Sequence, residues 1–218
     1  MTRAPDDDRG PSPPHAEPRA PRRVWRNLER LLVVIGLASL GYVGYVSVES
    51  RLYQAFENRE LDAILASVPT QPPHAASSSA HLRPRPLNGS TIGRIDIPRL
   101  GVSTVIRAGS DARTLRLAVG HVPGTALPGE IGNIGLAGHR DTFFRRLRDI
   151  RPDDEIRIVT PEGTFAFRVE GTSVVMPKDT WVLDATNVPT LTLVTCYPFT
   201  YIGSAPKRFI VRATGIQS

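Results

Sequence analysis

EIRIVTPEGTFAFRVE, residues 155–170, contains the clearest strand pattern of this 218-residue chain. Apolar and polar side chains alternate over residues 155–160 and again over 164–170, which is the period of a half-buried strand. Residues 161–163, Pro-Glu-Gly, separate the two runs. Since a three-residue connection with a late glycine is typical of a β-hairpin, the stretch predicts two adjacent antiparallel strands.

Similar short runs lie on both sides of this hairpin and are broken by Gly and Pro. They are IGRIDIP at 92–98, LTLVTC at 191–196 and RFIVRAT at 208–214. No stretch from Thr91 onward sustains a long helical period. The pattern predicts a small all-β barrel or sandwich over residues 91–218, and a domain of roughly 130 residues can bury an adequate core without disulfides.

An apolar segment precedes this domain. LLVVIGLASLGYVGYVSV, residues 31–48, contains no charged side chain. At about 1.5 Å of rise per residue, a helix of this length just spans the hydrocarbon core of a bilayer. A cleaved signal peptide fits less well, because the run exceeds the roughly 7–15 apolar residues of such a peptide and no A-x-A site follows it. The segment therefore predicts one N-terminal transmembrane helix.

Charges that flank the apolar segment predict its orientation. Five arginines lie just before it, whereas the charges after it nearly balance: Arg19, Arg22, Arg23, Arg26 and Arg30. By the positive-inside rule we expect residues 1–30 to form a disordered basic cytoplasmic tail and everything after Val48 to be extracytoplasmic. Residues 49–67 carry an imperfect apolar helical stripe and the segment that follows is rich in Pro and Ser, so residues 49–90 predict a stalk helix and a linker.

Composition excludes two classes of function. The formal net charge is +6, but no basic helix or aromatic-interleaved basic stretch accompanies it, which argues against nucleic-acid binding. One cysteine and scattered histidines such as His15, His74 and His81 do not build a closed zinc site.

Cys196, in LVTCYPF at 193–199, is the only cysteine of the chain. Exported domains usually place cysteines in disulfide pairs, and this residue has no partner within the chain. One interpretation is a small hydrophobic side chain in the core, beside the apolar LTLV run. The other is a nucleophile, which requires a proton-transfer group and a cationic side chain nearby.

Two histidines of the domain are candidates for proton transfer. His139 ends the apolar run in NIGLAGHRDTFFRRL, residues 133–147, and so is expected at a strand end, where Asp141 or Thr142 could cap a short following helix. His121, in AVGHVPG, has an equal claim on composition.

An arginine could be the third member of a catalytic group formed with the cysteine and a histidine. Nucleophilic acyl transfer combines a thiolate, an imidazole that moves protons and a donor that stabilises the oxyanion. Arg208 lies on the strand-like run after the cysteine, so antiparallel pairing could bring it beside Cys196. Spacing alone leaves Arg212, Lys207 and Arg140 as alternatives.

Together these motifs resemble a known family. Residues 192–196, Thr-Leu-Val-Thr-Cys, match the TLxTC motif of sortases, the cysteine transpeptidases that attach surface proteins to bacterial envelopes or polymerise pilins. Residues 138–142, Gly-His-Arg-Asp-Thr, resemble their histidine-bearing segment. Arg208 occupies the place of their essential arginine, twelve residues after the cysteine. The resemblance covers about residues 91–218, behind the family's usual N-terminal anchor, and is greatest to class D sortases.

The resemblance implies an all-β fold, an eight-stranded β-barrel with short helices, preceded by the transmembrane helix. It implies that Cys196 attacks the Thr carbonyl of an LPxTG-like motif and forms a thioacyl enzyme, which an amine then resolves. His139 is expected to protonate the leaving amine and to accept a proton from the incoming one. Arg208, together with Thr195, is expected to hold the substrate carbonyl or the oxyanion, and His121 to lie nearby as a supporting residue.

The resemblance also implies partners and a location. The substrates would be exported proteins with a C-terminal LPxTG-like signal, and the accepting amine would belong to a peptidoglycan precursor or a pilin lysine. The catalytic domain would lie outside the cytoplasmic membrane. No cofactor or metal is expected to be required, although some relatives bind calcium near the loop that corresponds to residues 178–187, where Asp179 and Asp184 lie.

Two other functions remain open from the sequence. One is a membrane-anchored cysteine peptidase that transfers its acyl group to water. The other is a non-catalytic envelope scaffold that binds peptides by strand addition and keeps Cys196 packed in its core.

Overall fold

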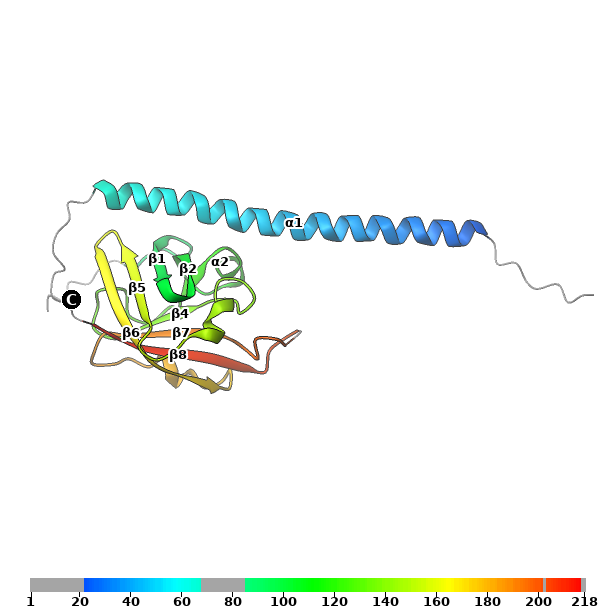
Figure 1. The fold of residues 1–218 in the computed structure, drawn as a ribbon. Coiled ribbons are helices and arrows are strands. Elements are labelled where there is room, and N and C mark those ends of the chain that lie inside the picture. The colour runs from blue at the N-terminus through cyan, green and yellow to red at the C-terminus, as the bar shows by residue number, and fades with distance from the viewer. Residues whose placement is uncertain (1–21, 68–84, 202, 217–218) are drawn as a thin grey trace, which may run out of the picture. The chain divides into compact units, whose positions relative to one another are not determined.

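The computed structural model describes residues 22–67, 85–201 and 203–216 (Figure 1). The chain divides into two compact units, residues 1–46 and 47–218, and each is described by itself. Residues 1–21 of the predicted tail and 68–84 of the predicted linker lie outside the described residues, as do His15, His74 and His81.

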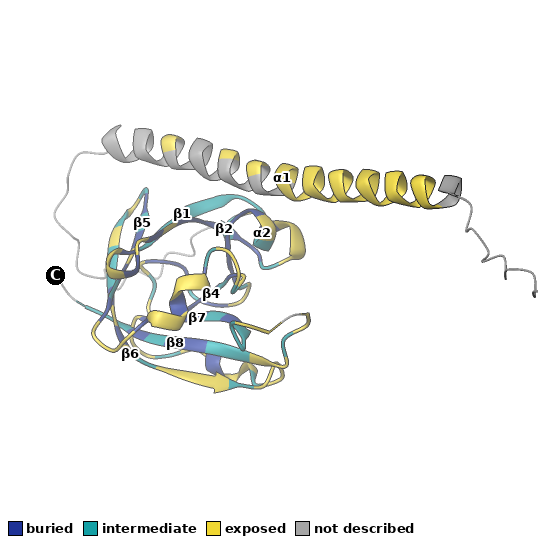
Figure 2. Cartoon of the chain, turned by 45° about the vertical axis from the view of Figure 1, so that its right-hand side comes forward, coloured by how far each residue is buried: buried dark blue, intermediate teal, exposed yellow. Residues whose placement is uncertain are grey.

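The N-terminal helix α1 spans Arg22–Ser67. Within it, Trp25–Tyr45 is long and apolar enough to cross a membrane, and the side chains described there are exposed (Figure 2). The predicted disordered tail is wrong for residues 22–30, which are helical. The reason is that RRVWRNLER contains neither Gly nor Pro to interrupt a helix. The predicted stalk helix is the direct continuation of the same helix.

The domain that follows is a closed barrel with the strand order β1-β2-β3-β4-β7-β8-β6-β5. The predicted eight-stranded barrel is therefore confirmed. The strands are β1 (Thr91–Ile97), β2 (Val102–Ala108), β3 (Val119–His121), β4 (Asn133–Ala137), β5 (Glu155–Thr160), β6 (Gly163–Val175), β7 (Thr190–Tyr197) and β8 (Lys207–Gly215). The connections contain the short helices η1 (Pro98–Leu100), α2 (Ala112–Leu117), η2 (Arg145–Asp149) and η3 (Thr180–Leu183). Pairs β2–β3 and β4–β7 are parallel, and the other pairs are antiparallel.

The predicted hairpin is present as β5 and β6. Gly163 already belongs to β6 and pairs with Thr160, so the turn has two residues where the sequence predicted three. Gly163 has a φ of 148°, a conformation that side chains rarely adopt, which explains why a glycine closes this turn. Strand β6 continues to Val175 past an irregularity between Val169 and Gly171.

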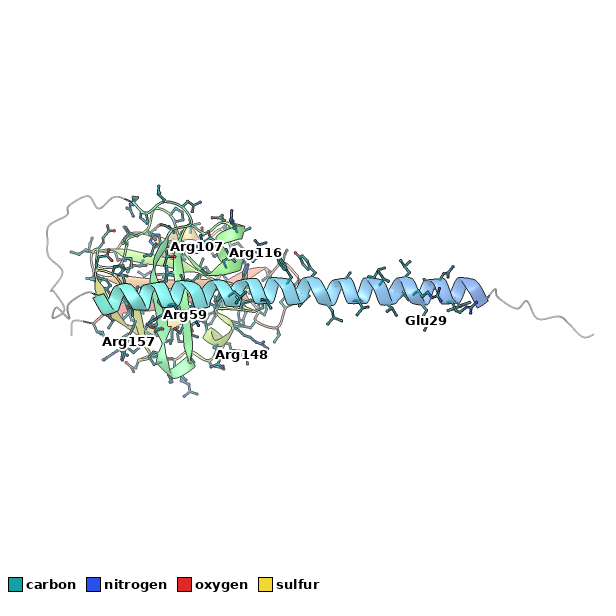
Figure 3. The ribbon with its side chains drawn as sticks, turned by 90° about the horizontal axis from the view of Figure 1, so that it is seen from above. Glu29, Arg59, Arg107, Arg116, Arg148 and Arg157 are labelled. Atoms are coloured by element: carbon teal, nitrogen blue, oxygen red, sulfur yellow. The ribbon has the colours of Figure 1, made fainter. Side chains whose placement is uncertain are left out.

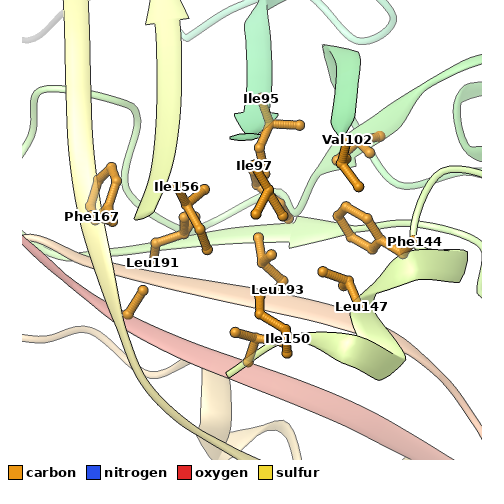
Figure 4. Close-up of a cluster of buried hydrophobic side chains, with 14 of the residues drawn as sticks. Ile95, Ile97, Val102, Phe144, Leu147, Ile150, Ile156, Phe167, Leu191 and Leu193 are labelled. Carbon is orange, nitrogen blue, oxygen red and sulfur yellow. The ribbon is translucent and has the colours of Figure 1, made fainter. Parts of the chain in front are cut away.

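Alternate residues of the strands fill the barrel, as the period of two requires. Figure 4 shows this core, in which Ile95 of β1 and Ile156 of β5 meet Leu191 and Leu193 of β7, and all four are fully buried. Burial of each such side chain contributes about 1.5–3 kcal/mol.

The segment after His139 supplies two further core side chains, Phe144 and Leu147, both fully buried. The expectation that Asp141 or Thr142 caps a helix here is wrong. Residues 141–144 form a turn in which the Phe144 N–H donates to the His139 carbonyl at 3.0 Å. The helix η2 begins only at Arg145 and has no side-chain cap. Burial of the two apolar side chains, rather than capping, determines this geometry.

Candidate active site

Strands β7 and β8 bring Cys196 and Arg208 together. The two residues are directly opposite each other in the antiparallel register, and such pairs have Cβ atoms about 4.5–5.5 Å apart on one face of the sheet. This confirms the expectation that strand pairing places them side by side. Cys196 is a free, partly buried cysteine outside the core cluster.

A cleft of about 300 Å³ lies over this pair. Its wall is formed by the segment after β4, by β7, by the β7–β8 connection and by the start of β8. The lining residues are His139, Arg140, Asp141, Cys196, Gly203, Ser204, Ala205 and Arg208. Three of the five predicted site residues therefore share one cleft, and they come from three different parts of the sequence. His139 is exposed within it.

Thr195 fixes the position of the histidine segment against the cysteine strand. The Gly138 N–H donates to the Val194 carbonyl at 3.1 Å, which extends the β4–β7 pairing by one residue. The Thr195 hydroxyl donates to the Gly138 carbonyl at 2.7 Å. Thr195 is 2% exposed and does not line the cleft. Its side chain therefore lies behind the histidine segment and not in the wall of the cleft.

Gly138 permits this close approach. A Cβ atom at this position would lie 2.7 Å from the ring of Phe144, closer than two carbon atoms can pack. Because Phe144 is fully buried in the core, its ring cannot move away. A glycine directly before His139 is thus a packing requirement of the turn.

Arg208 is oriented by the β7–β8 connection. Its Nη1 group donates to the carbonyls of Ala205 at 3.2 Å and Lys207 at 3.0 Å. Of the alternatives that the sequence left open, Arg140 also lines the cleft, whereas Lys207 and Arg212 do not. Lys207 pairs with Tyr197, and Arg212 lies opposite Thr192, four residues before the cysteine.

Arg140 joins the two sides of the cleft. It follows His139 directly, and its Nη1 group donates to the Pro198 carbonyl at 2.9 Å. Its Nη2 group donates to the carbonyls of Tyr201 and, at 3.1 Å, Gly203. The guanidinium carbon lies 5.9 Å from the centre of the Tyr201 ring, a cation–π distance. Arg140 therefore holds the β7–β8 connection against the histidine segment.

His121 is not part of the cleft. It lies on β3, is 4% exposed, and its Nε2 group is 2.8 Å from the Ala126 carbonyl and 3.2 Å from the Thr125 hydroxyl. Nε2 donates to the carbonyl, so the ring supports the turn after β3. Burial lowers the pKa of His121 below its ordinary value, and the hydrogen bond to Ala126 opposes that shift.

A buried polar network on the outer face of β4, β7 and β8 was not predicted from the sequence. Asn133 donates to the carbonyls of Val182 at 3.0 Å and Asp184 at 3.1 Å. The Thr192 hydroxyl donates to the Asn133 side chain at 2.7 Å, and Arg212 donates to the Val182 carbonyl at 3.1 Å. This network fixes η3 on the barrel. The only signal in the sequence is a polar residue at alternate positions of otherwise apolar strands.

Of the two residues considered for calcium, Asp179 uses its carboxylate in a turn and Asp184 uses its backbone at the end of a helix. Asp179 accepts a hydrogen bond from the Met176 N–H at 2.8 Å, and Asp184 ends η3. Among the residues that the structure describes, no three His, Cys, Asp or Glu side chains form a group that could hold a metal ion.

A closed barrel with a Cys–Arg pair and a histidine in one cleft defines the class of protein. Residues 95–216 match the family model described as Sortase domain. The chain is 32% identical to Sortase D of Bacillus subtilis over 186 residues, which cover 83% of this chain and 93% of that protein. The chain therefore belongs to the sortase family, and it is a cysteine transpeptidase of that family.

Solved structures agree with this assignment. The Sortase D5 transpeptidase of Clostridium perfringens is 38% identical with a TM-score of 0.56, over 60% of this chain and 82% of that one. Sortase C1 of Streptococcus suis is 27% identical with a TM-score of 0.55, over 60% and 75%. The resemblance to class D sortases that the motifs predicted is confirmed.

Proposed function

We propose that this protein is a membrane-anchored transpeptidase that cleaves an LPxTG-like sorting motif in exported proteins through a thioacyl enzyme. The observation that carries this proposal is the shared cleft of Cys196, His139 and Arg208. The acyl group then passes to an amine of a peptidoglycan precursor or a pilin lysine, so the reaction attaches surface proteins or polymerises pilins.

In the first half of the reaction, the Cys196 thiolate attacks the carbonyl carbon of the substrate threonine. His139 donates a proton to the departing amine as the C–N bond breaks. In the second half, the incoming amine gives a proton to His139 and attacks the thioacyl carbonyl, and the thiolate leaves. A solvent-exposed imidazole can exchange protons between the two halves, and His139 is exposed in the cleft.

Arg208 suits the stabilisation of the oxyanion. Its Nη1 group is engaged with the Ala205 and Lys207 carbonyls, which leaves the rest of the guanidinium fork for the substrate. Fixed donors need no reorganisation when charge develops, and this is why preorganised donors lower the barrier. Arg208 cannot act as the base, because a guanidinium group offers only donors and no acceptor for a proton.

Two features support the anchored arrangement. The apolar stretch Trp25–Tyr45 of α1 is long enough to cross a bilayer. Arginines dominate the side before residue 31, which favours a cytoplasmic N-terminus and an extracytoplasmic barrel by the positive-inside rule.

The test is intact-mass analysis of the full chain in detergent, incubated with a varied library of LPxTG-like peptides, with and without triglycine. We expect a thioacyl adduct that triglycine removes, and none with Cys196→Ala. His139→Ala and Arg208→Lys should each slow adduct formation at least about 100-fold. Arg157→Lys, an exposed change on the outside of the barrel, is the matched control (Figure 3).

Two outcomes would redirect the assignment of the reaction. Transfer to water alone, with every amine tested, would indicate a cysteine peptidase. A Cys196 that reacts with no peptide and also resists a small alkylating reagent would indicate a scaffold. The position of Cys196 outside the core cluster argues against the scaffold.

A further inference from the structure

The cleft contains one carboxylate among the described residues that line it, Asp141. It is exposed and lies two residues after His139. The other charged groups of the lining are the guanidinium groups of Arg140 and Arg208. Asp141 is thus the only acidic side chain among the described lining residues, in a cleft whose other formal charges are positive.

Neither arginine of the cleft forms an ion pair with Asp141. Both Nη groups of Arg140 donate to backbone carbonyls of the β7–β8 connection. The Nη1 group of Arg208 donates to the carbonyls of Ala205 and Lys207. The Asp141 carboxylate forms neither an ion pair nor a side-chain hydrogen bond with any residue that the structure describes. Among the described residues this side chain therefore has no bonded partner, and it is not hydrogen-bonded to His139.

We propose that Asp141 is the recognition site for the cationic amine acceptor. This inference rests on the proposed function and adds the residue that selects the second substrate. Primary amines with a pKa of about 8–10 are mostly protonated at neutral pH, so the acceptor arrives as an ammonium ion. A carboxylate attracts that ion into a cleft whose other charges are positive.

The position next to His139 connects recognition with chemistry. The ammonium held by Asp141 gives one proton to the neutral His139 imidazole and becomes a free amine. The amine lone pair then forms the C–N bond with the thioacyl carbon, and the C–S bond breaks with both electrons passing to the Cys196 sulfur. The second amine proton leaves to solvent. No other reactant is needed.

Asp141→Asn tests this because it keeps the shape and removes the charge. The full chain is acylated with a sorting peptide, and the ratio of transfer to hydrolysis is measured with two nucleophiles, triglycine and hydroxylamine. Triglycine carries an ammonium group, whereas hydroxylamine is uncharged at neutral pH. Asp149→Asn is the matched control, since Asp149 is exposed on the same segment, pairs with Arg148 and does not line the cleft.

At low ionic strength we expect Asp141→Asn to reduce the ratio for triglycine about fivefold, the size of one exposed charge interaction. The ratio for hydroxylamine should change less than twofold, Asp141→Glu should restore most of the triglycine ratio, and added salt should reduce the difference. Asp149→Asn should behave as the wild type.

Two results would overturn the inference while leaving the proposed function intact. One is an unchanged triglycine ratio in Asp141→Asn, and the other is an equal decrease for both nucleophiles, which would indicate a general structural effect. Failure of the wild-type chain to form any thioacyl adduct would be a different result, because it would overturn the proposed function and this inference with it.

Discussion

The hydroxyl of Thr195 donates a 2.7 Å hydrogen bond to the carbonyl of Gly138. The bond joins the residue before Cys196 to the residue before His139. The proposed mechanism requires Cys196 and His139 to meet over one substrate, and this buried contact helps to fix their two segments, which lie 57 residues apart in the chain. The relative position of Cys196 and His139 depends on the Thr195 side chain, although Thr195 lies outside the cleft.

Thr195→Val tests this contact, since valine has nearly the same shape but no hydroxyl. The buried Gly138 carbonyl then loses a partner, and we expect a loss of about 1–3 kcal/mol in the free energy of unfolding, measured by urea denaturation. Thioacyl formation should slow more than substrate binding, because the mutual position of His139 and Cys196 is disturbed. Thr195→Ser retains the donor and should remain close to wild type. Equal rates in Val and Ser variants would contradict the positioning role.

Arg140→Lys tests the link between the histidine segment and the β7–β8 connection. A lysine has one ammonium and cannot reach the three carbonyls that the guanidinium fork contacts. We expect faster hydrogen exchange over residues 198–206 and about tenfold slower thioacyl formation. Arg145→Lys, on the exposed start of η2, is the control. Unchanged exchange over 198–206 would show that the connection is held by other contacts.

Asn133→Leu addresses the network under η3. The substitution removes the donor to Val182 and Asp184 and the acceptor for the Thr192 hydroxyl. The buried Thr192 hydroxyl then loses its 2.7 Å acceptor and the Asp184 carbonyl loses a donor, while the Val182 carbonyl keeps Arg212. We expect the free energy of unfolding to fall by about 1–3 kcal/mol. Hydrogen exchange should accelerate over residues 176–189. The double variant Asn133→Leu, Thr192→Val removes both partners of one bond and should recover part of the loss.

Removal of divalent ions should leave activity unchanged. Asp179 is engaged with the Met176 N–H, and its carboxylate stabilises a turn without a cation. We expect transpeptidation after extensive EDTA treatment to equal that of the untreated protein, and added calcium to have no effect. We also expect Asp184→Asn to leave the transpeptidation activity unchanged. Activity that EDTA abolishes and calcium restores would show that the β6–β7 connection binds the ion.

The parts of this fold that the sequence predicted are those with local signals. Alternation over 155–170 revealed the β5–β6 hairpin, and the pairing of Cys196 with Arg208 followed from two strands joined by one connection. Contacts between distant segments had no such signal. Arg140 is one of several arginines in the sequence, and only the folded chain shows that its partners are backbone carbonyls some 60 residues away. Every residue has a backbone carbonyl, so the type of a residue does not indicate whether its carbonyl accepts such a hydrogen bond.

His121 gives the domain a pH dependence that is independent of catalysis. Burial lowers its pKa in the folded state below the ordinary value of 6.5, so the unfolded chain binds the proton more readily. Stability is then fully present above about pH 6.5 and is lost as the pH falls through the folded pKa. Urea denaturation at pH 7.5, 6.5 and 5.5 should show this decrease, which His121→Gln should reduce, because glutamine can donate to Ala126 without titrating. The positive charge of Arg85 acts in the same direction as burial, because it also lowers the pKa of His121. A wild-type decrease between pH 6.5 and 5.5 that is equally large in His121→Gln would assign the pH dependence to other groups.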